Sequence, residues 1–191
     1  MSAWKHFCTI TRHRRLVRRV CFKMGLYWQG LVHDLSKYSP AEFIPGAKYF
    51  VGYRSPNDMQ RRAEGYSSAW LHHKGRNKHH FEYWTDYLVD ENGKVGSGFV
   101  KMPVKYVAEM FADRIAACKV YQGKDYTDAS PLEYFQKGKH RGNFMHEETD
   151  ELLRKMLTML SEEGEDKTTK FIKNTVLKKG YESFKGTKYD N

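Results

Sequence analysis

The segment that follows Pro103 constrains the fold most. It reads "VKYVAEMFADRIAACKVYQG" and repeats apolar residues at intervals of three or four positions. This spacing puts them on one face of an α-helix. The face consists of Val104, Val107, Phe111, Ile115 and Cys118. The segment therefore predicts a long helix, opened by a proline, that lies against the core of a helical protein.

Further helical patterns fill most of the chain. Gly25 is the expected end of a helix over residues 4–24, whose apolar stripe is Phe7, Ile10, Val17, Val20 and Met24. Other helices are predicted at residues 26–37, from Pro40 through "AEFIPGAKYF", from Pro56 to a cap at Gly75, over "HHFEYWTDYL" and "SPLEYF", and at residues 146–162 and 166–180. Turn signals near residues 88–101 predict a small hairpin or loop. We expect one all-α domain over residues 1–191.

Composition narrows the class of protein. At 191 residues and 40% hydrophobic content, the chain is long enough to bury a core of its own. No stretch approaches the roughly 20 apolar residues that span a bilayer, and "MSAWKHFCTITRHRR" lacks the apolar centre of a signal peptide. Three scattered cysteines are typical of reduced thiols. We therefore expect a cytoplasmic protein without a membrane partner.

The formal net charge of +10 is unevenly distributed. No acidic residue precedes Asp34, whereas the same stretch contains Lys5, Arg12, Arg14, Arg15, Arg18, Arg19 and Lys23. This balance favours anionic partners such as nucleotides, phosphorylated metabolites or nucleic acid. A solvated basic helix face without a partner is the alternative interpretation.

Histidine is abundant and clustered, because four of the nine histidines lie in "LHHKGRNKHH". First-row divalent metals favour imidazole and carboxylate ligands. The candidate metal ligands are therefore His13, His33, Asp34, His72, His73, His79, His80 and Asp113. A core histidine at position 13 and a surface histidine tract are the alternatives. We expect His140 and His146, which follow these motifs, at the surface.

Asp113 is informative because it lies within "MFADRIAA", the most apolar helical segment. Burying a carboxylate is costly unless it is paired or coordinates a metal. An ion pair with an arginine is the rival use. The adjacent Arg114 is a poor candidate, since neighbours on a helix do not face each other.

Basic residues accompany these ligands. Lys37 follows Asp34 by three positions, so it shares a helical face with Asp34 and could place a cation near a phosphate. Its alternative role is a helix-end lysine that interacts with the helix dipole. The loop between the two His-His pairs carries the candidate substrate-binding residues Lys74, Arg76, Asn77 and Lys78. A flexible basic loop would have the same sequence.

The order His, His-Asp, His and Asp resembles the HD-domain superfamily of metal-dependent phosphohydrolases. "HDLSK" is similar to the "HDIGK" of its HD-GYP branch, but "KHHFEYW" stands where that branch has glycine-tyrosine-proline. A cyclic-dinucleotide phosphodiesterase of that branch is therefore not expected. The stretches "QGLVHDLSKYSPAEF", "GYSSAWLHHKGRNKHHFEYW" and "MPVKYVAEMFADRIAA" also resemble an uncharacterised family of bacteria and phages, over residues 4–135.

The resemblance implies an HD-like helical bundle with its metal site in residues 4–135 and accessory helices in residues 140–185. One divalent ion (Mn, Fe, Co, Mg, Ni or Zn) would be bound by His13, His33, Asp34 and Asp113. A second ion, or the scissile phosphate, would be bound by some of His72, His73, His79 and His80. The two His-His pairs lie closer together than in binuclear HD proteins, which leaves the second site open.

The function that follows is hydrolysis of a phosphoester in a nucleotide or another anionic phosphate compound. A metal would activate water, and Asp34 or Asp113 would orient it. Lys37 and the "KGRNK" loop would neutralise the phosphate. A clustered histidine such as His73 or His79 would protonate the leaving oxygen.

Two alternatives use the same scaffold. A di-iron oxygenase would use the same ligands, although the positive charge fits phosphate better. A non-catalytic scaffold would bind a nucleotide or nucleic acid, with an affinity that falls steeply with salt. Its phosphate contacts would be Arg14, Arg15, Arg18, Arg19, Lys170, Lys173, Lys178 and Lys179. The C-terminal helices would close the core or form a homo-oligomer surface.

Overall fold

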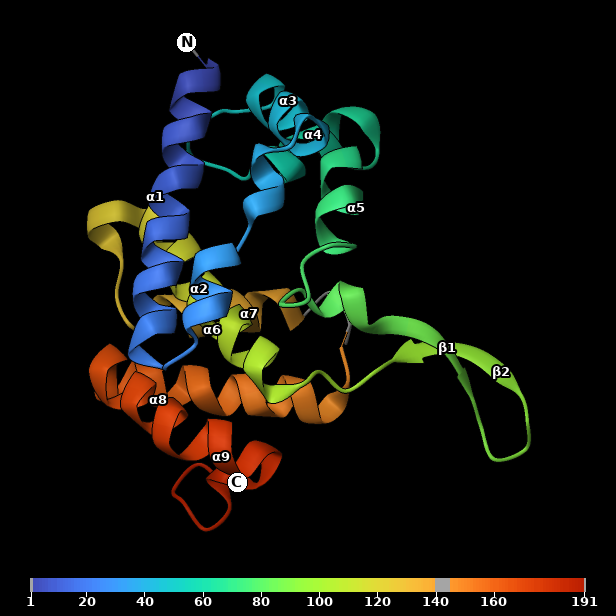
Figure 1. Ribbon diagram of the computed structural model, residues 1–191, viewed down its shortest axis with the longest axis vertical. Coiled ribbons are helices and arrows are strands. Elements are labelled where there is room, and N and C mark those ends of the chain that lie inside the picture. The colour runs from blue at the N-terminus through green and yellow to red at the C-terminus, as the bar shows by residue number, and fades with distance from the viewer. Residues whose placement is uncertain (1, 140–144, 191) are drawn as a thin grey trace.

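The computed structural model describes residues 2–139 and 145–190. The described part is a bundle of helices from which one antiparallel hairpin projects (Figure 1), and this confirms the expected all-α class. The helices are α1 (Ser2–Lys23), α2 (Tyr27–Val32), α3 (Pro40–Lys48), α4 (Pro56–Glu64), α5 (Ser68–Lys74), α6 (Val104–Gln122), α7 (Ser130–Lys139), α8 (Glu147–Phe171) and α9 (Leu177–Lys179). Short 3-10 turns cover Leu35–Tyr38, Phe81–Trp84, Gly123–Asp125 and Gly180–Phe184, and a π-helical turn covers Ile172–Val176.

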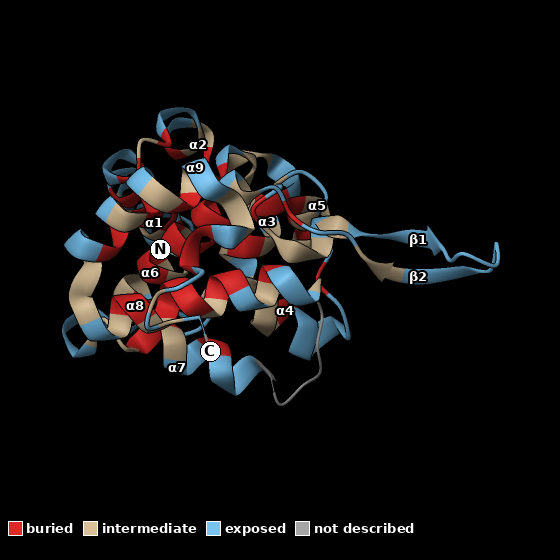
Figure 2. Ribbon diagram, turned by 90° about the horizontal axis from the view of Figure 1, so that it is seen from below, coloured by how far each residue is buried: buried red, intermediate tan, exposed pale blue. Residues whose placement is uncertain are grey.

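The centre of the core is the contact between α1 and α6. The predicted apolar faces meet there, with Val17, Cys21, Val107, Phe111 and Ile115 fully buried. Figure 2 shows buried segments concentrated in α1, α6 and α8. α8 adds a row of buried side chains, which are Leu152, Leu153, Met156, Leu157, Met159 and Leu160.

The helix expected over residues 26–37 is interrupted at His33 and Asp34. α2 ends just before this pair, and Asp34 has a left-handed backbone with a φ of 54°, a conformation that aspartate tolerates better than most residues. Arg14 of α1 donates to the carbonyl oxygens of Leu31 and His33 at 3.0 and 2.7 Å. These bonds satisfy the C-terminal end of α2, so the chain can turn and bury both His33 and Asp34.

The helix expected from Pro56 to Gly75 is two helices. Gly65 ends α4 with a φ of 80°, a left-handed value that glycine adopts without strain. Ser67 then caps α5 by accepting a hydrogen bond from the backbone N–H of Trp70 at 3.1 Å. The break turns α5 so that its His73 is buried.

The hairpin consists of β1 (Thr85–Val89) and β2 (Val95–Phe99). It begins earlier than expected, because the second half of "HHFEYWTDYL" is strand and not helix. Leu88 pairs with Gly96, and its side chain reaches the neighbouring Gly98, where a Cβ atom would come within 2.5 Å of Cδ1 of Leu88. The side chain of Tyr87, on the other face, is exposed.

α8 is interrupted at Gly164, whose φ of 81° and ψ of 167° are not helical. The break agrees with the expected separation of two C-terminal helices. His146 is half-buried, and its Nδ1 caps α8 by accepting an exposed hydrogen bond from the N–H of Glu148 at 3.3 Å. His140 lies outside the described residues. Among the described helices, none is long and apolar enough to cross a membrane.

Candidate metal centre

Candidate ligands from several segments of the chain meet around Asp34. They come from α1, the turn after α2, α5, the loop before the hairpin, and α6, and they are His13, His33, His73, His79, His80 and Asp113. Asp34 is fully buried, and its two carboxylate oxygens face different sets of nitrogen atoms. This one carboxylate therefore joins two groups that could each hold a metal ion.

The first group lies on the Oδ2 side of Asp34. Nε2 of His13 is 2.9 Å from Oδ1 of Asp113 and 3.5 Å from Oδ2 of Asp34. Nε2 of His33 is 3.4 Å from the same Asp34 oxygen. The four ligand atoms of the group lie within 4.8 Å of one another. This spread is close to the roughly 4.4 Å that separates opposite ligands of an ion bound at about 2.2 Å.

The second group lies on the Oδ1 side of Asp34. Nε2 of His73 and Nε2 of His79 are 3.3 and 3.4 Å from this oxygen. Nε2 of His80 completes the group at 2.8 Å from Nε2 of His73. Three imidazoles and one carboxylate suit a first-row divalent metal.

Glu109 of α6 connects the two groups. Its Oε1 is 2.9 Å from Nδ1 of His33 and 3.2 Å from Nδ1 of His79. A carboxylate that accepts from one ring nitrogen fixes the tautomer and directs the other nitrogen toward a metal. These three side chains also form a third group that could hold an ion. As a hydrogen-bond acceptor, however, Glu109 leaves one Nε2 atom directed at each side of Asp34.

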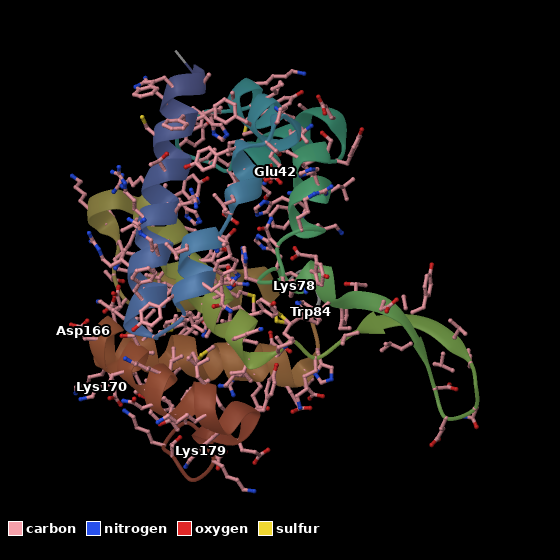
Figure 3. All side chains as sticks on the ribbon, viewed as in Figure 1. Glu42, Lys78, Trp84, Asp166, Lys170 and Lys179 are labelled. Carbon is pink, nitrogen blue, oxygen red and sulfur yellow. The ribbon has the colours of Figure 1, made fainter. Side chains whose placement is uncertain are left out.

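Glu42 of α3 supports the second group from behind. Its Oε2 is 2.7 Å from Nδ1 of His73, and its Oε1 is 2.7 Å from Nδ1 of His72. Figure 3 shows Glu42 between α3 and α5. The predicted ligand His72 therefore contacts Glu42 and is in none of the groups found among the described residues. Asn77 donates to the carbonyl oxygen of His73 at 2.8 Å and to Oγ of Ser36 at 2.9 Å.

Five buried atoms of the centre form no hydrogen bond within the described parts of the chain, although Oδ2 of Asp34 forms an ion pair with Lys37 and Nε2 of His13 lies 2.9 Å from Oδ1 of Asp113. The five atoms are Nε2 of His13, His33 and His79, and both carboxylate oxygens of Asp34. Buried polar atoms in native proteins are nearly always satisfied. A divalent ion at each group would satisfy the nitrogen and oxygen lone pairs together. The residues present therefore fit divalent metal ions.

The electrostatics of the centre also suit a cation. Burial alone would raise the pKa of Asp34, but the charges of His33 and Lys37 outweigh it and hold that pKa well below its usual range. The pKa of Asp113 is likewise held low, against burial, by its histidine partners. Burial, helped by a neighbouring histidine, lowers the pKa of His80. Asp34 and neighbouring carboxylates raise the pKa values of His33 and His73 against the effect of burial. A metal ion would replace the protons on these two histidines, because imidazole binds metal in its neutral form.

Of the basic residues predicted to bind substrate, only one lies beside the candidate metal centre. Nζ of Lys37 is 2.6 Å from Oδ2 of Asp34, and its side chain is 28% exposed, so Lys37 lies at the edge of the first group. Arg76 and Lys78 are exposed and Lys74 is half-buried. Between described residues, no hydrogen bond or ion pair joins the side chains of these three residues to the two groups. Lys78 instead lies at the base of the hairpin (Figure 3).

The two supporting carboxylates, Glu42 and Glu109, are not among the ligands predicted from the sequence. Glu109 had a usable signal, because it precedes Asp113 by four residues and so shares its helical face. Glu42 had none, since its contacts depend on how α3 packs against α5.

Comparisons with known proteins add a family but no activity. No curated protein and no solved structure shows significant similarity to the chain. A family model, by contrast, matches residues 2–159, which include every residue of the centre. The chain therefore belongs to DUF5662, a protein family of unknown function.

Proposed function

We propose that the protein is a metal-dependent phosphohydrolase of the HD type, with two divalent ions on either side of Asp34. The observation that carries this proposal is the set of five buried ligand atoms without hydrogen-bond partners in the described structure. The composition of the first group adds support, because His13, His33, Asp34 and Asp113 follow the ligand order of HD domains.

In this proposal, the residues of the protein hold the ions and orient the histidine ligands. A pair of divalent ions supplies an acidified water and neutralises the attacking and leaving oxygens of a phosphoryl group. Asp34 spaces the two ion positions through its two oxygens, and Glu109 and Glu42 hold the imidazoles in orientation. We assign His73 and His79 to metal binding and not to proton donation, because their Nε2 atoms face Asp34.

Lys37 is the residue that points to a phosphate substrate. Burial alone would lower its pKa, but Asp34 and Asp113 raise it, so the amine stays protonated. A charged amine at the partly exposed edge of the first group can contact a phosphate oxygen of an incoming ligand. The substrate class is a nucleotide or another phosphoester.

The test combines metal content with turnover. The purified protein is loaded with Mn²⁺, Co²⁺, Fe²⁺ or Mg²⁺, and the hydrolysis products of a panel of nucleotides and phosphodiesters are separated and quantified by chromatography. We expect two ions per chain and hydrolysis that depends on them. His33→Ala should abolish both, whereas His146→Ala, outside the centre, should preserve both.

Two outcomes would contradict the proposal. One is no turnover with any metal. The other is oxygen consumption by the iron-loaded protein without hydrolysis of any phosphoester, which would favour a di-iron oxygenase.

A further inference from the structure

The outward face of α1 carries a row of arginines. Arg12, Arg15, Arg18 and Arg19 are all exposed, and their spacing of three or four positions places them side by side on the helix. The row is about 10 Å long, at 1.5 Å per residue. His13 is buried on the opposite side of the helix.

These four arginines have no counter-charge among the residues that the structure describes. In the described ranges, no ion pair or hydrogen bond involves any of their side chains. Two other basic residues of α1 are engaged: Arg14 binds backbone carbonyls, and Lys23 binds Glu165 and Asp166. The helix contains no acidic residue of its own. Nothing on α1 therefore offsets the repulsion between arginines three and four positions apart, which points to a partner outside the chain.

Two aromatic rings continue the row. Phe22 follows Arg18 by four positions and Arg19 by three, so it shares their face. Its ring packs edge-to-face against Tyr27 of α2, with centroids 5.3 Å apart. The two residues are 38% and 57% exposed. Exposed rings beside a row of cations are what a single strand of nucleic acid needs, since its bases stack while its phosphates bind the cations.

We propose that this surface, the α1 arginine face (Arg12, Arg15, Arg18 and Arg19 with Phe22 and Tyr27), binds single-stranded nucleic acid. The planar guanidinium matches two phosphate oxygens at once. The buried side of α1 packs against α6, so only the exposed rings of Trp4, Phe7 and Phe22 remain on this helix to contact a lipid bilayer, less than the continuous apolar face that an interfacial helix inserts. The surface lies away from His13, so this binding goes beyond the proposed hydrolysis and does not depend on it.

The test measures binding and its salt dependence. A fluorescein-labelled 20-nucleotide DNA of mixed sequence is titrated with the full chain, and anisotropy is followed over a series of salt concentrations. With four phosphate contacts, the slope of log K against log salt should be about −3, at roughly 0.7 per contact. Replacing all four arginines by glutamine should weaken binding at least tenfold and bring the slope close to zero.

The matched control removes four positive charges from another surface of the protein. Lys170, Lys173, Lys178 and Lys179 are also exposed, and Figure 3 labels two of them near the C-terminal end of the molecule. Their joint replacement by glutamine should weaken binding less than threefold. An equal loss in both variants, with both folded by circular dichroism, would reduce the effect to net charge and overturn the proposal.

Two further measurements separate the partner classes. Tyr27→Ala should weaken binding of the single strand but not of a duplex of the same length, and no difference would overturn the stacking role. Polyglutamate and phosphatidylserine vesicles serve as competing polyanions. If either binds the arginine face more tightly than the oligonucleotide does, the face belongs to an acidic protein or a lipid surface and the proposal is wrong.

Discussion

The two sides of α1 differ in whether their charged side chains have partners of opposite charge. On the inner side, His13 lies within 3.5 Å of carboxylate oxygens of Asp34 and Asp113. On the outer side, the four arginines of the α1 arginine face have no partner among the described residues. Because α1 contains no acidic residue, every counter-charge that it meets comes from another part of the fold.

The difference shows what burial demands. A charge removed from water is costly unless a partner replaces the water, so the inner histidine lies among carboxylates. Exposed arginines are solvated and can remain unpaired. Atoms without a partner therefore carry different information on the two sides of α1. On the inner side they are positions that a bound ligand could satisfy, whereas on the outer side they indicate a partner only when spacing and neighbouring side chains agree.

The largest expected effect compares the loss of a buried carboxylate with the loss of an exposed one, measured by metal content and kcat/KM. Asp34→Asn should eliminate both ion sites and lower kcat/KM by more than about 1000-fold, because several kcal/mol of charge stabilisation depends on the ions. Asp166→Asn, which removes an equal but exposed charge of α8 that is paired with Lys23 of α1, should leave both ions bound. Metal analysis and initial rates measure the two effects. An Asp34→Asn protein that retains two ions per chain would break the comparison.

His6 extends the inner side of α1 to a position without carboxylate partners. Its ring packs near Phe43 and Phe50, and burial, with the charge of Lys37, lowers its pKa to about 4. As pH falls below 6.5, the unfolded chain takes up a proton before the folded chain does. Stability is therefore unaffected above this pH and is lost between pH 6.5 and 4, by about 3 kcal/mol in total.

Urea unfolding of the chelator-treated protein at several pH values measures this loss. The His6→Gln variant should lack that part of the pH dependence, whatever its stability at pH 7. Identical slopes for the two proteins between pH 6.5 and 4 would show that His6 is not held neutral.

Glu109 tests whether the inner side depends on orientation as well as charge. Glu109→Ala should weaken metal binding by about 10–100-fold, the usual effect of losing a carboxylate behind a ligand histidine. Glu109→Gln should cost less, because its amide oxygen still accepts from the ring N–H groups. Calorimetric titration with Mn²⁺ measures both, with the exposed Glu182→Ala as control. Equal Mn²⁺ affinities in all variants would show that Glu109 does not contribute to metal binding.

The smallest expected effect is on the free energy of unfolding, for substitutions on the outer side of α1. Lys23 is 38% exposed and binds Glu165 and Asp166, so Lys23→Met should cost only about 0.2–1 kcal/mol of unfolding free energy. Arg15→Met, on the unpaired row, should cost nothing measurable. Denaturation at low and high salt compares the two, and the difference should shrink as salt screens the ion pairs. A larger loss for Arg15→Met would mean that the row stabilises the fold.

The helices that carry the centre could be predicted because their patterns are local. The apolar stripes of residues 4–24 and of the segment after Pro103 correspond to α1 and α6. His13 and Asp113 could be recognised because each lies within or beside such a stripe. The turn at Asp34 could not, since it depends on Arg14 binding the carbonyl groups at the end of α2. Glu42 and His72 depend in the same way on the packing of α3 and α5.

The sequence by itself determined the helical class, the basic N-terminal helix and the kinds of residue able to bind a metal. Periodicity and composition act over a few neighbouring residues, so they can be read along the chain. Only the tertiary structure decided that Asp34 lies between two groups, that Glu109 connects them and that His72 stays outside. Those facts depend on distances between residues far apart in the sequence, and such distances are set by how the helices pack against one another.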